Sequence, residues 1–131
     1  MDAVRNLQFS VLDTHEVSAL LLVPTNAMCL LVMAHGAGAG MNHSFMEAMV
    51  SALATDGVGT FRYQFPYMER RAKRPDTPAV AVAAVRAAVE EAARVAPGLP
   101  LVAGGKSFGG RMTSTAQATA EIGRASCRER V

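Results

Sequence analysis

Ser107 stands in the segment Gly105-Lys-Ser-Phe-Gly109, which matches the pattern G-x-S-x-G. This pattern forms a sharp strand-to-helix turn, the nucleophile elbow, which holds a serine hydroxyl clear of the backbone. A serine attacks a carbonyl efficiently when a base removes its proton and N–H groups stabilise the resulting oxyanion. The sequence therefore predicts acyl transfer at Ser107, with the backbone N–H of Phe108 as one oxyanion donor.

A glycine-rich segment earlier in the chain supplies the second expected donor. His35 to Gly40 have the sequence HGAGAG and directly follow an apolar run. We predict that the backbone N–H of Ala37 completes the oxyanion hole. His35 is expected to shape this loop by hydrogen bonding, because the catalytic histidine of this arrangement follows the serine. The three histidines of the chain all precede Ser107: His15, His35 and His43.

Hydrophobic periodicity predicts the elements that position these groups. Residues 7–11 and 17–23 alternate as a hairpin, with a turn at 13–15. The expected buried strands cover 28–34, 58–65 and 99–104, and the expected helices cover 44–55, 78–96 and the residues after 110. Because strands and helices alternate after the hairpin, we expect an α/β fold with a mostly parallel sheet and right-handed crossovers.

Two of the helices carry local signals. Ser44 is the expected N-cap of helix 44–55, and Glu47 is expected to complete a capping box. One apolar stripe of this helix is expected to face the sheet. That stripe consists of Phe45, Met49 and Leu53. In helix 78–96, Glu90 and Arg94 are spaced for an i,i+4 ion pair. Three valines form its expected buried stripe: Val82, Val85 and Val89.

Composition favours one packed domain. The chain has 131 residues, 50% of them hydrophobic and 18% charged, which is typical of a globular protein and not of a disordered one. A net charge of +2 gives no nucleic-acid footprint, and the basic cluster at 70–74 is expected to be a solvated loop. Two cysteines make no disulfide framework, and Cys29 is expected in the core. No signal peptide or membrane-spanning run is evident, so a cytoplasmic location is expected.

The sequence partly resembles two phosphate-binding patterns but matches neither. The segment that ends in Gly105-Lys106-Ser107 would need a glycine where Pro100 stands in order to be a P-loop. The loop at 36–41 has Met41 at the third glycine position of the dinucleotide fingerprint. Nucleotide binding is therefore disfavoured. No cofactor and no metal site are expected, since no cluster of ligands supports either.

Three blocks resemble a known family: HGAGAG at 35–40, FPYM at 65–68 and GGKSFGGR at 104–111. Together they are similar to predicted bacterial α/β-hydrolases of the dienelactone-hydrolase type, whose related domains occur in eukaryotic chromatin-associated proteins. The resemblance extends from residue 7 to about residue 118. It implies an α/β-hydrolase fold, Ser107 as nucleophile, and an ester or lactone substrate. Phe108 replaces the usual methionine and keeps the backbone N–H. The family's later strands, with the triad aspartate and histidine, match nothing in this sequence.

The last residues differ in character. Residues 121–131, EIGRASCRERV, have no apolar periodicity and resemble a translated sequencing-library adapter. We therefore predict that 1–120 is the N-terminal part of one α/β-hydrolase domain and that 121–131 is a non-native tail. The fold is then truncated after the elbow and its helix. The elbow strand is expected to be an unpaired edge of the sheet.

These observations lead to two functional hypotheses. The first is the N-terminal fragment of a serine hydrolase that cleaves a small-molecule ester, thioester or lactone through an acyl-enzyme on Ser107. Without a triad acid and histidine, the chain as given is expected to be inactive. The alternative is a non-catalytic α/β-hydrolase-like interaction module. Neither hypothesis involves a nucleic acid or a membrane, and neither assigns an oligomeric state.

Overall fold

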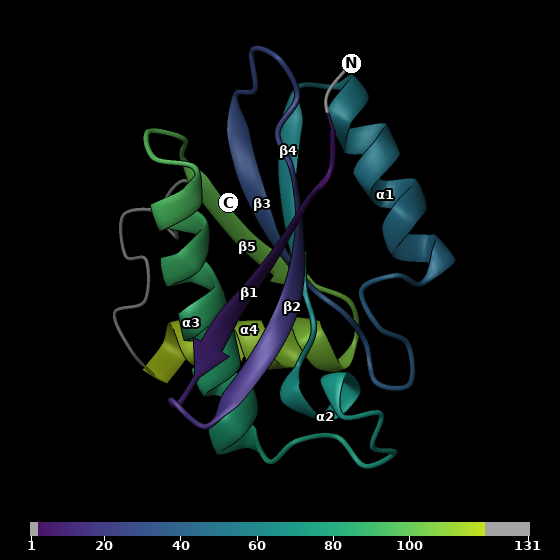
Figure 1. The fold of residues 1–131 in the computed structure, drawn as a ribbon, viewed down its shortest axis with the longest axis vertical. Coiled ribbons are helices and arrows are strands. Elements are labelled where there is room, and N and C mark those ends of the chain that lie inside the picture. Colours follow the sequence, from purple (N-terminus) through teal and green to yellow (C-terminus); the bar gives the residue numbers. More distant parts are fainter. Residues whose placement is uncertain (1–2, 120–131) are drawn as a thin grey trace.

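The computed structural model of the chain describes residues 3–119, which form one sheet with helices on both faces (Figure 1). The predicted tail at 121–131 lies outside the described residues. In chain order the elements are β1 (Arg5–Val11), β2 (His15–Leu22), β3 (Cys29–Ala34), α1 (Ser44–Thr55), β4 (Val58–Tyr63), α2 (Pro66–Glu69), α3 (Pro78–Val95), β5 (Leu101–Gly105) and α4 (Phe108–Thr119).

The sheet has the strand order β1-β2-β4-β3-β5. β1 and β2 form the predicted antiparallel hairpin, β2 is antiparallel to β4, and β4, β3 and β5 are mutually parallel. Among the described strands, only β2 therefore runs against the others. The predicted α/β architecture, a hairpin followed by alternating strands and helices, is confirmed.

β5 forms one edge of this sheet. Its residues pair with β3 in parallel register, from Leu30 opposite Leu101 to Ala34 opposite Gly105. Within residues 3–119, no strand pairs with the other side of β5. The prediction that the elbow strand is an edge is thus confirmed for the part of the chain that the structure describes.

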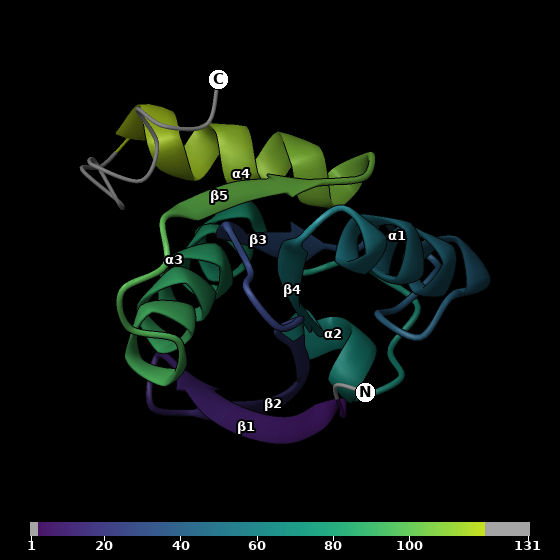
Figure 2. The same cartoon turned by 90° about the horizontal axis from the view of Figure 1, so that it is seen from above.

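The two faces of the sheet have cores of unequal size. α3 and α4 lie over one face and α1 lies over the other (Figure 2). The α3 face holds the larger cluster, which includes the aromatic residues Phe61, Tyr63 and Phe65. The α1 face is packed around Met33, Met46 and Val50. The aromatic cluster is therefore the main source of hydrophobic stabilisation behind the site.

The start of α1 differs from the prediction. The N-cap is His43, whose Nδ1 accepts a hydrogen bond from the N–H of Phe45 at 3.1 Å. Ser44 is already helical, so the predicted capping box with Glu47 is wrong. The Glu47 carboxylate instead forms an ion pair with Arg62 at 3.1 Å.

The buried stripe of α1 is also rotated from the predicted one. Met46 and Val50 are buried, while Met49 and Leu53 pack at the margin of the core. Phe45 is 41% exposed and does not face the sheet. The three predicted residues lie along one side of the apolar face, whose centre is one helical position further on.

α3 follows its sequence signals closely. Pro78 occupies the first turn, and the hydroxyl of Thr77 accepts a hydrogen bond from the N–H of Val80 at 3.5 Å. The predicted valine stripe is buried, together with intervening alanines. Arg94 pairs with Glu91 and not with the predicted Glu90, because i,i+3 neighbours also meet on a helix.

The segment after β4 contains a short helix that periodicity did not predict. β4 ends at Tyr63, two residues before its predicted end, and α2 follows immediately. The basic side chains at 70–74 are exposed, as expected. Cys29 is only half-buried. In residues 3–119 no helix has both the length and the hydropathy needed to cross a membrane.

Candidate active site

The turn between β5 and α4 has the shape of a nucleophile elbow. Ser107 lies in the left-handed region at φ 54°, a conformation that costs a non-glycine residue about 1–2 kcal/mol. The N–H of Lys106 donates to the carbonyl of Ala34 at 3.1 Å, and the N–H of Arg111 donates to the carbonyl of Ser107 at 2.9 Å. The strain at Ser107 is therefore held by the end of β3 and by the first turn of α4.

Glycine is required where α4 approaches β3. A Cβ at Gly109 would lie 2.4 Å from the carbonyl oxygen of His35 and 2.7 Å from the Cβ of Ala34. A Cβ at Gly105 would lie 2.7 Å from the carbonyl oxygen of Ala34. These contacts are too short for any side chain, so both glycines allow the elbow to sit directly against the backbone of β3.

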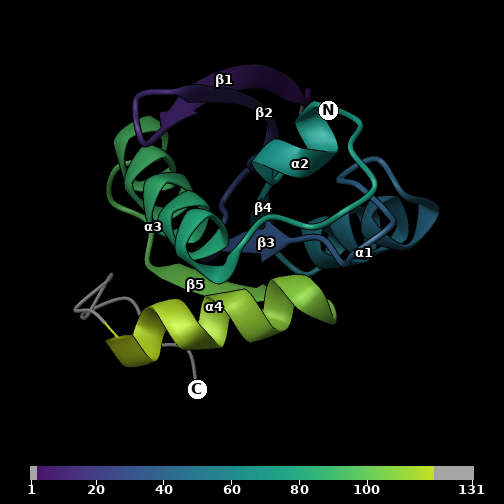
Figure 3. The same ribbon diagram turned by 90° about the horizontal axis from the view of Figure 1, so that it is seen from below.

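The glycine-rich loop after β3 lies beside the elbow. A Cβ at Gly36 would be 3.5 Å from the Cβ of Ser107 and 3.3 Å from the carbonyl oxygen of Lys106. Ala37, the next residue, is exposed. The structure thus brings the predicted oxyanion loop and the predicted nucleophile together at the carboxyl ends of β3 and β5, the end that Figure 3 views from below.

Phe108 is the first residue of α4 and has two distinct environments. Its side chain is buried and stacks edge-on against Phe65, with ring centroids 5.2 Å apart. Its backbone N–H belongs to the first helical turn, whose N–H groups have no partner within the helix. Its place in the first turn is compatible with the oxyanion-donor role predicted from the sequence, which stays a prediction.

His35 is fully buried behind the loop, and both of its ring nitrogens are occupied. Nε2 accepts a hydrogen bond from the N–H of Phe65 at 3.0 Å, and Nδ1 lies 2.8 Å from the carbonyl oxygen of Gly36. This pattern requires a neutral ring with its proton on Nδ1. Burial lowers the pKa of His35, and the Gly36 carbonyl and the charge of Asp76 oppose that shift. The expectation that His35 shapes the loop is confirmed.

Lowering the pH is expected to destabilise the chain through His35. Because its folded pKa lies below the ordinary value of 6.5, the unfolded state gains a proton first as the pH falls. The free energy of unfolding should therefore fall below pH 6.5, with a slope of up to about 1.4 kcal/mol per pH unit. Urea denaturation at about pH 7.5 and about pH 5.5 measures this slope, and the His35→Asn variant is the control. Equal slopes in the two proteins would contradict the prediction.

The other two histidines have positions unlike that of a base. His43 caps α1 and is exposed. His15 begins β2 and is half-buried, although the sequence predicted that it would belong to the turn. β2 and β5 are three strand spacings apart in the sheet, which is about 14 Å. His15 is therefore too distant from Ser107 to take its proton.

Two acidic side chains near the site are used in local structure. The Glu69 carboxylate accepts hydrogen bonds from the N–H of Ser18 at 3.0 Å and from its hydroxyl at 2.9 Å. Asp76 accepts one from the N–H of Tyr67 at 2.9 Å, with the Arg70 guanidinium 3.7 Å away. These carboxylates fix α2 and the loop that follows it. Among residues 3–119, no three acidic, histidine or cysteine side chains are grouped as metal ligands.

Sequence reasoning missed three residues that support this site: Arg62 in β4, Gln64 directly after it, and Tyr67 in α2. Arg62 and Gln64 bond to the loop before α1, and the buried ring of Tyr67 packs against His35 and Phe108. A charged residue inside an otherwise apolar strand was the available signal for Arg62. Tyr67 had no such signal, because a single aromatic residue after a proline is equally compatible with an ordinary core position.

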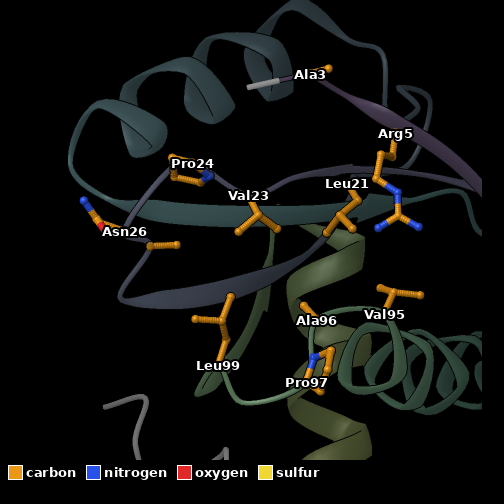
Figure 4. Close-up of a pocket in the computed structure, with 11 residues that line it drawn as sticks. Ala3, Arg5, Leu21, Val23, Pro24, Asn26, Val95, Ala96, Pro97 and Leu99 are labelled. Atoms are coloured by element: carbon orange, nitrogen blue, oxygen red, sulfur yellow. The ribbon is translucent and has the colours of Figure 1, made fainter. Parts of the chain in front are cut away.

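A pocket of about 470 Å³ lies at the opposite end of the sheet (Figure 4). It is lined by residues before β3, at the end of α3 and before β5, including Val23, Pro24, Ala96, Pro97 and Leu99. Ser107 follows the carboxyl end of β5. The pocket therefore does not belong to the candidate active site.

Comparison with known proteins agrees with the α/β fold. A family model described as an alpha/beta hydrolase domain matches residues 27–127. The chain belongs to this family. The matched range includes part of the segment 121–131, so the boundary at residue 120 stays a prediction. A comparison with curated protein sequences gave no match.

Solved α/β-hydrolase structures share the fold at low sequence identity. A dienelactone hydrolase from Anabaena variabilis is 18% identical with a TM-score of 0.77, over 89% of this chain and 57% of that protein. The Pyrococcus furiosus esterase Pf2001 is 12% identical with a TM-score of 0.75, over 92% and 49%. An alpha-beta serine hydrolase homologue from Coxiella burnetii is 15% identical with a TM-score of 0.75, over 90% and 59%. The chain thus spans about half of each relative's length.

Proposed function

We propose that this chain is the nucleophile-bearing part of a serine hydrolase that cleaves an ester, thioester or lactone. The observation that carries the proposal is the strained Ser107 between β5 and α4, with Gly36 of the glycine-rich loop against its Cβ. Strain of this kind persists where the surrounding structure enforces it, and it is common at nucleophiles. The family membership and the hydrolase names of the structural relatives support the same chemistry.

The proposed reaction proceeds through an acyl-enzyme. A base takes the proton of the Ser107 hydroxyl, and the oxygen attacks the substrate carbonyl carbon. The N–H groups of Phe108 and Ala37 donate to the oxyanion. Its collapse expels the alcohol or thiol, which receives the proton from the base. Water then attacks the acyl carbonyl by the same route and releases the acid.

The base and its acidic partner are proposed to come from a longer protein. No histidine follows Ser107 in the sequence, and the two nitrogens of His35 are already bonded. In this family's order of catalytic residues, the acid and the histidine follow the serine. The chain by itself is therefore expected to show negligible triad-dependent turnover, although an oxyanion hole alone leaves weak activity.

A fluorophosphonate probe tests the proposal on the longer protein. We expect covalent labelling that disappears in Ser107→Ala and persists in Ser114→Ala, a control at an exposed serine of α4. Mass spectrometry of the labelled peptide locates the adduct. Labelling that survives Ser107→Ala would overturn the assignment. A longer protein that takes no label and has no later histidine favours the interaction module.

A further inference from the structure

The loop that carries Ala37 is fastened to β4 at Met41. The carbonyl oxygen of Met41 accepts a hydrogen bond from the Arg62 guanidinium at 3.1 Å, and its N–H donates to Oε1 of Gln64 at 2.9 Å. We infer that Arg62 and Gln64 are positioning residues that hold the second oxyanion donor in place. This inference rests on the proposed function of Ser107.

Burying the guanidinium of Arg62 costs desolvation free energy. Its side chain is 6% exposed, on the sheet face that α1 covers. Its one carboxylate partner among the described residues, Glu47, has a side chain that is 55% exposed. Replacing a buried ion pair as a whole by apolar residues is often neutral or stabilising. A role in stability alone therefore explains Arg62 poorly, whereas a role in fixing the Met41 carbonyl explains it directly.

The side chain of Gln64 also lies against the backbone of Gly40. A Cβ at Gly40 would lie 2.7 Å from Oε1 of Gln64 and 3.0 Å from Cγ of Met68. The side-chain amide of Gln64 therefore packs directly on the loop backbone. This contact and the hydrogen bond together fix the position of the Met41 N–H. An apolar side chain at position 64 would leave this N–H without its acceptor.

Two anchors enclose the candidate donor. On one side, His35 bonds to the N–H of Phe65, the second residue after β4. On the other side, Met41 is held by Arg62 and Gln64. Ala37 lies between these anchors, and a turn closed by the N–H of Ala39 and the carbonyl of Gly36, at 3.4 Å, shortens the intervening chain. The path of the loop at Ala37 is thus constrained on both sides by Arg62 of β4 and by Gln64 and Phe65, which directly follow β4.

Loss of the Met41 anchor should affect the transition state more than the bound substrate. The oxyanion exists only after attack, so a displaced donor lowers kcat while leaving KM nearly unchanged. A misplacement of about 1 Å can cost about 100-fold in rate, and removal of a whole donor costs about 100- to 1,000-fold. A fall of about 10- to 100-fold in kcat is therefore expected when either anchor is removed.

The test compares four variants of the longer protein with an activated ester. Arg62→Met and Gln64→Leu are expected to lose about 10- to 100-fold in kcat with KM within about twofold. Arg62→Lys and Gln64→Glu keep a donor or an acceptor and should recover most of that loss. The affinity for a trifluoromethyl ketone, which mimics the oxyanion, should fall by the same factor as kcat.

Glu47→Gln is the matched control, because it breaks the ion pair of Arg62 without touching Met41. It is expected to leave kcat within about twofold. Full kcat in both Arg62→Met and Gln64→Leu overturns the inference, and so does an equal loss in Glu47→Gln. If Arg62→Met does not fold, the kcat values of Gln64→Leu and Arg62→Lys still test the inference. Ser107→Ala separates the two levels: unchanged turnover in that variant refutes the proposed function, whereas its loss beside intact anchor variants refutes this inference alone.

Discussion

Replacing Gly109 by alanine is expected to destabilise the chain severely, by about 3 kcal/mol or more. The added Cβ would lie 2.4 Å from the carbonyl oxygen of His35 and 2.7 Å from the Cβ of Ala34. Ala34 ends β3 and is held in the sheet, and His35 directly follows it with both ring nitrogens hydrogen-bonded, so neither can yield as a flexible side chain would. The first turn of α4 must therefore move away from β3, and the elbow must open with it.

Gly104→Ala is the matched control for Gly109→Ala. A Cβ at Gly104 would meet only Cδ1 of Leu31, at the ordinary contact distance of 4.0 Å. This variant should change the free energy of unfolding by less than about 1 kcal/mol. Urea denaturation of both variants measures the difference. Equal stabilities for the two would show that α4 does not pack on β3 as closely as described.

Replacing Ser107 by glycine is expected to stabilise the fold while abolishing catalysis. Serine at φ 54° bears a backbone strain that glycine does not have. Ser107→Gly should therefore raise the free energy of unfolding by about 1 kcal/mol, whereas Ser107→Ala, which keeps a Cβ, should leave it nearly unchanged. In the longer protein both variants should lose on the order of 10⁴-fold or more in kcat, because the attacking oxygen is gone.

Two measurements separate these effects. Denaturation of this chain and of its two variants gives the order of stability, and ester hydrolysis by the longer proteins gives the order of activity. A glycine variant less stable than the wild type would mean that Ser107 is unstrained. A variant that retains turnover would mean that another group is the nucleophile.

The elements that position the site followed from local sequence patterns. Alternation predicted the β1–β2 hairpin, and hydrophobic periodicity predicted a helix over 78–96, which α3 follows from Pro78 to Val95. The apolar run before HGAGAG and the run before GKSFG predicted two parallel strands that end beside each other, which the pairing of β3 with β5 confirms. These features depend on residues close in sequence, so hydrophobic periodicity is sufficient to predict them.

The supports of the oxyanion loop depend on contacts between distant segments. Arg62 meets Met41 across 21 residues, and the N–H of Phe65 meets His35 across 30. Arg62 was missed because the sequence of the strand at 58–65 contains no information on which distant carbonyl its side chain would bond. α2 escaped prediction because four residues are too few to show helical periodicity. Phe45 was misplaced because its apolar character fitted the stripe, while the structure sets it under the Lys106 ammonium at 5.0 Å.

Within residues 3–119 one side of β5 has no partner strand, so under the proposed function the activity of Ser107 would depend on a further folding step at this edge. A later strand that joins the sheet beside Ser107 must take its hydrogen bonds from β5, since β3 already occupies the other side. The step that closes this edge is thus also the step that brings later residues next to the serine. A hydrolase divided after α4 would cleave esters only when its two parts are associated. The rate of ester cleavage would then report the concentration of the assembled enzyme.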